Sequence, residues 1–422
     1  GARFKGYRDF VVQDLVIEVH NTRYRLERWV TPEGKEIVGQ LPAALKNRHF
    51  GPQLTRYILY QHHHCQTTQP LLLEQLREWG VDISAGQINQ LLMADQALFH
   101  AEKEALLQAG LSASDYVTVD DSGARHQGKN GYVTQLGNEF FAWFSSTDTK
   151  SRVNFLALLR AGHQDYVLTE AALCYMQQQK LPAAPLAALR QHVGQRIASR
   201  GDWEELLASL SITRTRPLRI ATEGALLGSV LDHGLCDDAG QFNVLQHALC
   251  WVHAERLIHK LIPLNDLHRE DVARVRGQVW DLYRDLKAYK RQPDEATRAT
   301  LTRRFDAVFT QRTRFATLDR TLKGIHRNKA ELLRVLDRPE IPLHTNGSET
   351  DIRDYVKKRK VSGGTRSEEG RRCRDTFISL KKTCRKLGIA FWQYLADRLD
   401  IGDQSIAPLP DIVRERAAAT TY

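Results

Sequence analysis

Apolar and polar positions follow two different periods along this chain of 422 residues. Residues 8–42 alternate apolar and polar side chains around a turn signal at 32–35. This alternation predicts a small β-rich element over residues 1–45. From residue 46 to residue 112 the apolar positions change to helical spacing, which predicts a helical region.

Two helices can be placed within that helical region. The first, over 69–80, has a proline near its start and a glycine at its end. Ser84 can cap a second helix over 85–92. Such a pair is typical of a helix-turn-helix, whose second helix enters a DNA groove, and equally of an ordinary helical pair.

Three short strands follow at 116–120, 131–136 and 139–144, and Gly137-Asn138 forms a hairpin turn between the last two. We expect the first strand to be central in its sheet and to end at two neighbouring acids. Helical segments and one more short strand, at 218–222, come next. The predicted domains are 1–45, a β-rich element; 46–112, helix-turn-helix-like; 113–253, the first part of an α/β core with a helical insert at about 152–215; 254–343, an all-α insertion; 344–400, the second part of the core with a basic helix; and 401–422, a C-terminal tail.

Charge and composition narrow the functional class. The formal net charge of +10 favours nucleic acid or an anionic membrane surface as the partner. No run of 18 apolar residues occurs, so we expect no membrane-spanning helix. The six cysteines are scattered without a Cys-x-x-Cys pair, which predicts a reduced cytoplasmic protein. The run at 62–65 (HHHC) lies in a helical stretch where successive side chains diverge, so a metal site is not expected there.

Much of the positive charge follows residue 352. Between residues 352 and 386 there are 13 lysines and arginines against 4 acids, and DNA phosphates are their natural partner, although a solvated helix face is an alternative. We expect the Gly363-Gly364 turn to bring backbone close to a phosphate. The predicted DNA-binding residues are Arg353, Lys357, Arg359, Lys360, Arg366, Arg371 and Arg372. The apolar residues predicted for the same helix recur every three or four positions and are predicted to be core: Phe377, Leu380, Cys384, Leu387, Phe391 and Leu395.

Acidic residues at three separated positions suggest the chemistry. Transfer of a phosphodiester bond can use two divalent ions about 4 Å apart, and Mg²⁺ prefers carboxylate oxygens. The candidates are Asp120 or Asp121, Asp237 or Asp238, and Glu349. Neighbouring strand residues face opposite sides, so one member of each aspartate pair would serve the site. Glu349 follows a segment that can cap a helix, and would point inward beside Arg353.

The ordered motifs resemble the insertion-sequence 66 family of bacterial transposases, over roughly residues 40–395. The matching segments are 119–123 (VDDSG), 235–238 (LCDD), 247–256 (HALCWVHAER) and 346–353 (NGSETDIR), followed by Arg359-Lys360 and Gly363-Gly364. The resemblance implies a catalytic, metal-binding triad of Asp120, Asp237 and Glu349. It also implies an RNase H-like mixed sheet interrupted by helical insertions, and Mg²⁺ or Mn²⁺ as the cofactor, as two ions.

The chain also departs from the family pattern. Asp121 stands where many relatives have glutamate, residues 1–40 lack a cysteine-rich zinc module, and the stretch before Asp237 is long. Cys250 and His253 lie one helical turn apart. They and His247 could hold zinc, but no fourth ligand is evident, so we assign Cys250 and His253 a structural role near the site.

The main hypothesis is therefore a DDE transposase that cleaves the ends of its element and transfers the freed 3′-hydroxyl to target DNA. Its partners would be double-stranded DNA, further copies of the chain on paired ends and possible accessory transposition proteins, with no membrane. Its location would be the bacterial cytoplasm, at the nucleoid. The rivals are a catalytically inactive DNA-binding relative, an RNase H-like nuclease without strand transfer, and a zinc hydrolase using His247, Cys250 and His253.

Overall fold

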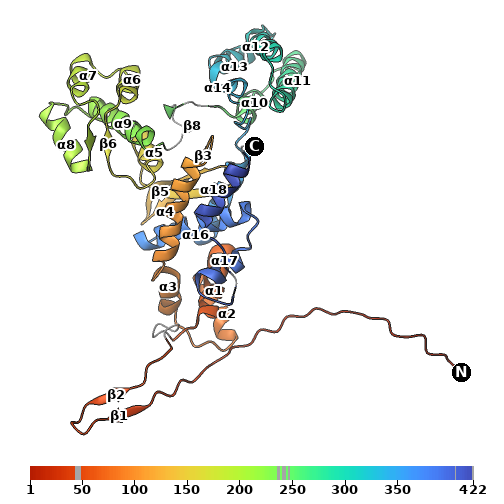
Figure 1. The fold of residues 1–422 in the computed structure, drawn as a ribbon. Helices are drawn as coiled ribbons and strands as arrows, with labels where there is room; N and C mark the ends of the chain where they lie inside the picture. Colours follow the sequence, from red (N-terminus) through yellow and green to blue (C-terminus); the bar gives the residue numbers. More distant parts are fainter. Residues whose placement is uncertain (43–48, 235–237, 240–243, 246–247, 404, 421–422) are drawn as a thin grey trace. The chain divides into compact units, whose positions relative to one another are not determined.

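The structure is a computed structural model that describes residues 1–42, 49–234, 238–239, 244–245, 248–403 and 405–420. The chain divides into two units, one of residues 1–94 with 395–404 and the other of residues 95–394 with 405–422. Helices predominate and the strands form small sheets, so the fold class is mixed α/β (Figure 1).

An exposed β-hairpin follows residues 1–27 of the first unit, which contain neither helix nor strand. Strands β1 (Arg28–Val30) and β2 (Glu36–Val38) pair antiparallel, with Trp29 opposite Ile37. Gly34 has a φ of +78°, a conformation that glycine adopts without steric cost, and lies in the turn between the strands. The predicted turn at 32–35 is confirmed, but residues 1–27 contain no strand, so the alternation over residues 8–27 did not indicate one.

Residues 52–93 of the first unit are mainly helical. Its helices are α1 (Pro52–Leu59), the π-helix η2 (Tyr60–His64), α2 (Gln69–Glu78) and α3 (Ala85–Met93). Gly80, with a φ of +85°, follows α2. Ser84 caps α3: its hydroxyl accepts from the Gln87 amide at 3.2 Å, and its own amide donates to the Gln87 side chain at 2.8 Å. Both predicted helices are confirmed; their use as a helix-turn-helix stays a prediction.

A three-stranded antiparallel sheet organises the second unit. Its strands are β3 (Thr118–His126), β4 (Lys129–Gly137) and β5 (Ala142–Thr147), in the order β3-β4-β5. The expected strands exist, but β3 continues six residues past Asp120 and lies at the edge of the sheet that the structure describes. The prediction that this strand ends at the acids was therefore wrong, and among the described strands β3 is not central. The reason is the tight turn at Gln127 and Gly128, both with positive φ, which keeps β3 and β4 paired to their ends.

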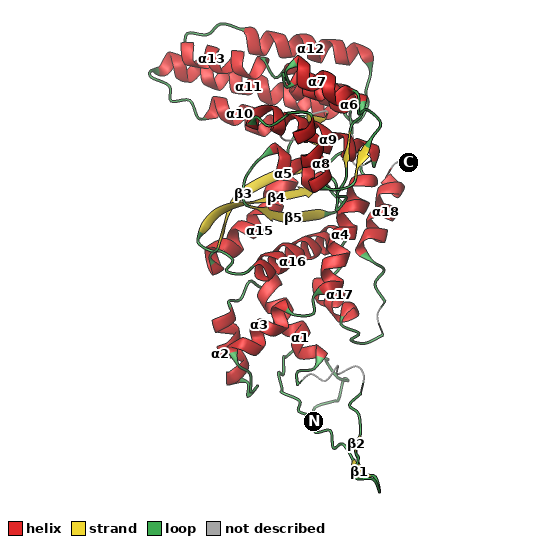
Figure 2. Ribbon diagram, turned by 90° about the vertical axis from the view of Figure 1, so that its left-hand side faces the viewer, coloured by secondary structure: helices red, strands yellow, loops and turns green. Residues whose placement is uncertain are grey.

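Two helices, α15 (Asn346–Ser362) and α16 (Glu368–Lys386), pack along this sheet (Figure 2). Their shared core contains Val133, Ala142, Phe144, Ile352, Tyr355 and Ile378. Side chains one turn apart on α16 accept hydrogen bonds from the free amides of β5 and so cover that edge. The pairs are Asp375 with Ser146 at 2.7 Å, Ser379 with Phe144 at 2.9 Å, and Thr383 with Ala142 at 3.1 Å. The predicted core residues Phe377, Leu380, Cys384 and Leu387 are buried.

Helix α4 (Ala97–Ser112) packs against both α16 and α18 (Leu409–Thr420). Helix α17 (Phe391–Arg398) follows α16 in the chain and contains the last two predicted core residues, Phe391 and Leu395, which are buried. The prediction of one helix through all six core residues was wrong, because α16 ends at Lys386 and Gly388, with a φ of +70°, turns the chain. Two further two-stranded pairings complete the strands that the structure describes: β6 (Tyr166–Val167) with β7 (Arg196–Ile197), and β8 (Asp238–Ala239) with β9 (Val244–Leu245).

A first helical segment follows β5. Its helices are α5 (Arg152–Leu159), α6 (Glu170–Gln178), α7 (Ala183–Arg190), α8 (Arg200–Ser209) and α9 (Thr215–Asp232). The predicted strand at 218–222 was wrong, because these residues belong to α9. A Cβ on Gly224 would lie 2.5 Å from the side chain of Met176, and one on Gly228 would lie 2.0 Å from the Val167 carbonyl. Close packing along one face of α9 thus favours a helix, whereas the pattern of five residues in isolation does not distinguish a helix from a strand.

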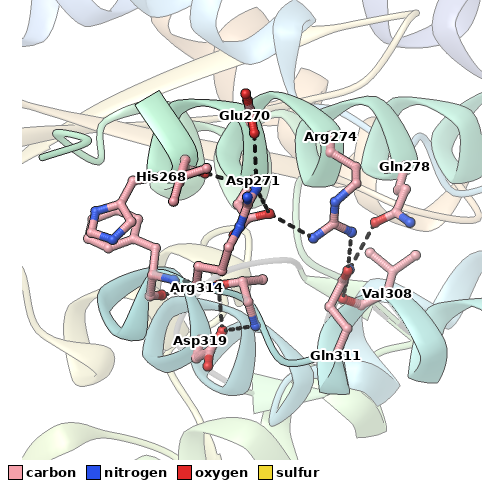
Figure 3. A network of polar contacts seen from close by, with 12 residues as sticks. His268, Glu270, Asp271, Arg274, Gln278, Val308, Gln311, Arg314 and Asp319 are labelled. Carbon is pink, nitrogen blue, oxygen red and sulfur yellow. Dashed lines mark hydrogen bonds and ion pairs between the residues drawn. The ribbon is translucent and has the colours of Figure 1, made fainter. Parts of the chain in front are cut away.

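A second helical segment has its own apolar core, formed by residues from Trp251 to Leu343. Its helices are α10 (Trp251–His259), α11 (Asp266–Tyr289), α12 (Glu295–Thr310), α13 (Ala316–His326), α14 (Lys329–Leu332) and the 3₁₀ helix η3 (Arg334–Leu336). A polar network ties α11 to the turn before α13 (Figure 3). Buried Asp271 accepts from the amide and Nε of Arg314 at 2.8 and 3.0 Å, and its second oxygen accepts from Nη2 at 3.0 Å.

Candidate active site

Asp120 and Asp121 are neighbours on β3 with different surroundings. The carboxylate of Asp121 forms an ion pair with Lys150, at 2.7 Å. The backbone amide of Asp121 donates to Oδ1 of Asp120, at 2.8 Å. Asp120 interacts electrostatically with Glu349 and His253. Since Lys150 neutralises Asp121, Asp120 is the better candidate of the two for a shared acidic site.

Glu349 lies in the first turn of α15, and a hydroxyl pair holds this end of the helix against β3. Thr118 donates to the carbonyl of Gly137 at 2.8 Å, so its hydroxyl hydrogen is used. The Ser348 hydroxyl, 2.5 Å from the Thr118 oxygen, is then the donor to it. Thr118 is two residues before Asp120 on β3, and Ser348 directly precedes Glu349. This contact therefore brings together two acids that are 229 residues apart in the chain.

The carboxylate of Glu349 is half-buried, and among the described residues no lysine or arginine forms an ion pair with it. Its Oε1 atom is buried and accepts no well-formed hydrogen bond from the described residues. The nearest cationic candidate is Nε2 of His253 on α10, at 3.4 Å. The site therefore has an acidic oxygen with unused capacity to accept.

The pKa of Asp120 is affected by the acidic side chains around it. Burial is the main cause that raises the pKa of Asp120 above its ordinary value, and the charges of Asp121 and Glu349 raise it further. The amide of Asp121 and the ring of His253 lower the pKa in part. Neighbouring carboxylates that disfavour one another's charge are a common arrangement at catalytic and cation-binding sites.

The other acids in the first half of α15 are neutralised within the fold. Asp351 lies 2.9 Å from Lys386 Nζ, and Asp354 lies 2.7 Å from Lys382 Nζ. Both lysines are on α16. Although burial raises the pKa of Asp354, the hydrogen bond and charge of Lys382, together with the charges of Lys381 and Lys357, hold it below its ordinary value. Glu349 is thus set apart from the acids that follow it on α15.

The second predicted acid, Asp237, lies outside the residues that the structure describes, as does His247. The backbone of the following residue, Asp238, pairs with Leu245 in the β8–β9 ladder. The structure therefore joins the elements that carry Asp120 and Glu349, two members of the predicted triad. The remaining member, Asp237, is not among the described residues.

Cys250 and His253 are at the start of α10, where Cys250 is the N-cap residue. His253 contacts Glu349, as described above, and Cys250 lines a small pocket with Val119 and Thr345. In the described part of the chain, the groups with metal-binding geometry include neither of these residues, nor any of His62 to Cys65. The contact between His253 and Glu349 fits the structural role that we assigned to this pair of residues.

The basic residues divide into two sets. Arg359 donates to the Gly123 carbonyl on β3, and Arg371 forms ion pairs with Asp148 and Glu368 at 2.9 and 2.8 Å. Lys357 lies 3.9 Å from Asp354. The predicted residues that are exposed and have no ion pair among the described residues are Arg353, Lys360, Arg366 and Arg372. Part of the positive charge on these helices is therefore used in contacts within the fold. The exposed residues without an ion pair form the second set and are the most available to a phosphate.

Gly364 has a packing role that the sequence did not suggest. A Cβ there would lie 2.5 Å from the carbonyl oxygen of Arg125, because Thr365 forms a parallel bridge with His126 on β3. The turn therefore approaches a strand, where we had expected it to approach a phosphate.

Sequence reasoning also missed Lys150, Thr118 and Ser348. Lys150 neutralises the rival acid Asp121, and the two hydroxyl residues anchor α15. No local pattern marks these residues, since their partners are distant in the chain.

Comparisons with known proteins identify the class of protein. A family model described as Transposase IS66 family matches residues 235–372, which include His253 and Glu349. Asp120 is outside this match. The matched segment is thus that of a transposase.

An uncharacterized protein named y4jO, from Sinorhizobium fredii (strain NBRC 101917 / NGR234), is 46% identical over 321 residues. The alignment covers 74% of this chain and 100% of that protein. The chain belongs to the IS66 family of transposases. None of the described helices is both long and apolar enough to cross a bilayer.

Proposed function

We propose that this transposase is a DDE recombinase, in which Asp120, Asp237 and Glu349 form one catalytic site for cutting and joining DNA. The observation that carries the proposal is the hydroxyl contact of Thr118 with Ser348, which joins the strand of Asp120 to the helix of Glu349. Lys150 neutralises the neighbouring Asp121. Membership of a transposase family supports the same reaction class.

The donor set fits a hard divalent cation. Glu349 offers a buried oxygen with no well-formed hydrogen bond, and Asp120 has a carboxylate whose charge is disfavoured by its acidic neighbours. Mg²⁺ or Mn²⁺, as two ions, would supply an activated water and a stabilised leaving oxygen when bound. Asp120, Asp237 and Glu349 would be the ligands. His253 would hold the Glu349 carboxylate in position through its contact at 3.4 Å.

Double-stranded DNA would lie along the exposed basic residues of α15, of α16 and of the connection between them. Arg353 is one helical turn beyond Glu349, so a phosphate bound there would be close to the reacting bond. Lys360, Arg366 and Arg372 would extend this contact, and binding would weaken with salt. We assign Arg359 mainly to holding α15 on β3, because it donates to Gly123.

The same proposal includes an RNase H-like core, with β3 to β5 as part of its sheet and helical segments inserted between β5 and α15. It includes a helix-turn-helix role for α2 and α3 in recognising element ends. Copies of the chain would pair two ends, with accessory proteins where the element encodes them, at the bacterial nucleoid.

The test is cleavage and strand transfer on duplexes that carry the DNA ends flanking the chain's own gene. Asp120→Asn and Glu349→Gln should each reduce both reactions by about a thousand-fold or more, since each removes several kcal/mol of charge stabilisation. DNA binding should persist. Asp121→Asn is the matched control, because it alters the adjacent acid that Lys150 already neutralises, and its activity should remain within a few-fold of wild type.

Two other outcomes would change the assignment. Wild-type protein that binds the ends but cuts nothing would indicate an inactive DNA-binding relative. Cutting without joining, and without preference for the ends, would indicate an RNase H-like nuclease. Retained strand transfer in Glu349→Gln would remove Glu349 from the site.

A further inference from the structure

A second group of ligating side chains lies on the contact between α4 and α16. It consists of His100 on α4 and of Glu369 and Cys373 on α16. His100 is 4% exposed and Cys373 is fully buried, whereas Glu369 is exposed. This group shares no residue with the acidic site built on Asp120 and Glu349.

The distances in this group match the edges of a tetrahedral zinc site. His100 Nε2 is 3.3 Å from Glu369 Oε1 and 3.9 Å from Cys373 Sγ. Glu369 Oε1 is 3.8 Å from Cys373 Sγ. With ordinary zinc–ligand bond lengths, tetrahedral angles require about 3.3–3.4 Å between nitrogen and oxygen and about 3.5–3.6 Å to sulfur. The first distance fits already, and the two distances to sulfur need to shorten by only about 0.3 Å.

The orientation of the histidine also suits a metal ligand. Its other ring nitrogen, Nδ1, lies 2.7 Å from the Thr376 hydroxyl, which is fully buried on α16. With the proton on Nδ1, the ring donates to Thr376 and directs the lone pair of Nε2 toward Glu369 and Cys373. A hydrogen bond of this kind on the far nitrogen is the usual outer support of a metal-bound histidine.

We propose that His100, Glu369 and Cys373 bind one zinc ion, with a water molecule as the fourth ligand on the side where Glu369 reaches solvent. A thiolate and an imidazole favour zinc over the hard ions expected at the acidic site. Glu369 and Cys373 are four residues apart and therefore lie on one face of α16, opposite His100. The ion would fasten α4 to the helix whose other side chains cover the edge of β5.

The second group with suitable geometry, His163, Asp165 and His233, is less suited to a metal. Asp165 already accepts from Arg196 at 2.6 Å and from Ser229 at 2.9 Å. The rings of His163 and His233 are stacked at 3.6 Å between centroids, so their nitrogens do not converge on one point between them. His233 also contacts both oxygens of Asp165, at 3.0 and 3.1 Å, so this carboxylate already has partners without a metal.

Zinc binding must displace the thiol proton, because burial raises the pKa of Cys373 to about 12 in the metal-free protein. A metal-free arrangement held by weak hydrogen bonds is therefore the rival account. The two accounts differ in metal content and in the effect of removing the thiol.

The experiment measures zinc in the full chain by elemental analysis after dialysis, without DNA, together with the absorption of protein loaded with Co²⁺. Wild type should hold about one zinc per chain and show a thiolate-to-cobalt charge-transfer band. Cys373→Ser should lose the band and most of the zinc. Glu369→Gln, whose exposed side chain can change without loss of fold, should weaken zinc binding at least ten-fold.

Cys384→Ser is the matched control, since Cys384 is equally buried on the same helix and outside the group. It should keep both zinc and the cobalt band. Zinc well below one per chain in wild type, or equal loss in the Cys373 and Cys384 variants, would overturn the proposal. Neither result depends on the acidic site, because no DNA, magnesium or manganese is present.

Discussion

Asp375 offers the sharpest test of the packing between α16 and the sheet. Its buried carboxylate accepts from the amide of Ser146 at 2.7 Å and from the Ser146 hydroxyl at 2.9 Å. Burial nevertheless raises the pKa of Asp375 from 3.8 to about 6, although Lys103 and Ser146 lower it in part. The substitution Asp375→Asn removes this titration and can keep both contacts. The asparagine oxygen can face the amide, and its NH₂ group can donate to the Ser146 hydroxyl, which then turns its hydrogen toward Tyr355 at 3.1 Å.

The magnitude follows from the shift in pKa. Because the folded state holds this proton more tightly, the contribution is present below about pH 4 and is lost as the pH rises through about 6. A difference of roughly two units corresponds to about 3 kcal/mol. The free energy of unfolding of Asp375→Asn should therefore equal that of wild type near pH 4 and exceed it by up to about 3 kcal/mol above pH 7.

The assay is urea denaturation followed by fluorescence at several pH values, with the difference between the two proteins plotted against pH. Other titrating groups cancel in this difference. Asp411→Asn, at an exposed helix position beside Arg414, is the control and should give a flat difference of a few tenths of a kcal/mol. A flat difference for Asp375→Asn, or a variant that is less stable above pH 7, would refute the reasoning.

Two further predictions concern stability. Asp271→Asn should lower the free energy of unfolding by about 2 kcal/mol at neutral pH, because it weakens the paired bonds to half-exposed Arg314. Arg314 holds the pKa of Asp271 well below its ordinary value, so the difference should stay constant down to about pH 4 and shrink as the pH falls further. A difference that is unchanged between about pH 4 and about pH 2 would contradict the assignment. Gly364→Ala should cost about 1–3 kcal/mol, since its Cβ would lie 2.5 Å from the Arg125 carbonyl, whereas Gly347→Ala, with no atom within 4 Å, should be nearly neutral. Equal thermal midpoints for the two glycine variants would show that the close approach to β3 does not matter.

The local elements could be predicted where the sequence marks their ends. Pro70, Gly80 and Ser84 delimited α2 and α3 correctly, and the turn residues located the strands of the sheet. The strand predicted at 218–222 was wrong, because a pattern of five residues cannot distinguish a strand from one face of a longer helix. Its helical state depends on packing against α6 and β6, which the local sequence does not encode.

The sequence predicted the acidic residues of the candidate site but not the residues that neutralise or position them. Alternation along a strand implied that only one of Asp120 and Asp121 would serve, but the choice depends on Lys150. The basic segment after residue 352 suggested DNA, yet Lys382 and Lys386 neutralise acids of α15 instead. Contacts between residues so far apart in the chain have no local signature, so only the fold reveals them.

The most direct test of the shared acidic site is a count of bound manganese ions in the presence of a short DNA duplex. Electron paramagnetic resonance would compare wild type with Asp120→Asn, Asp237→Asn, Glu349→Gln and the control Asp121→Asn. Wild type and Asp121→Asn should bind about two ions, and the other three variants should lose them, because each removes a ligand of the same site. If manganese binds equally to every variant, the three acids do not form one metal site and the catalytic centre lies elsewhere.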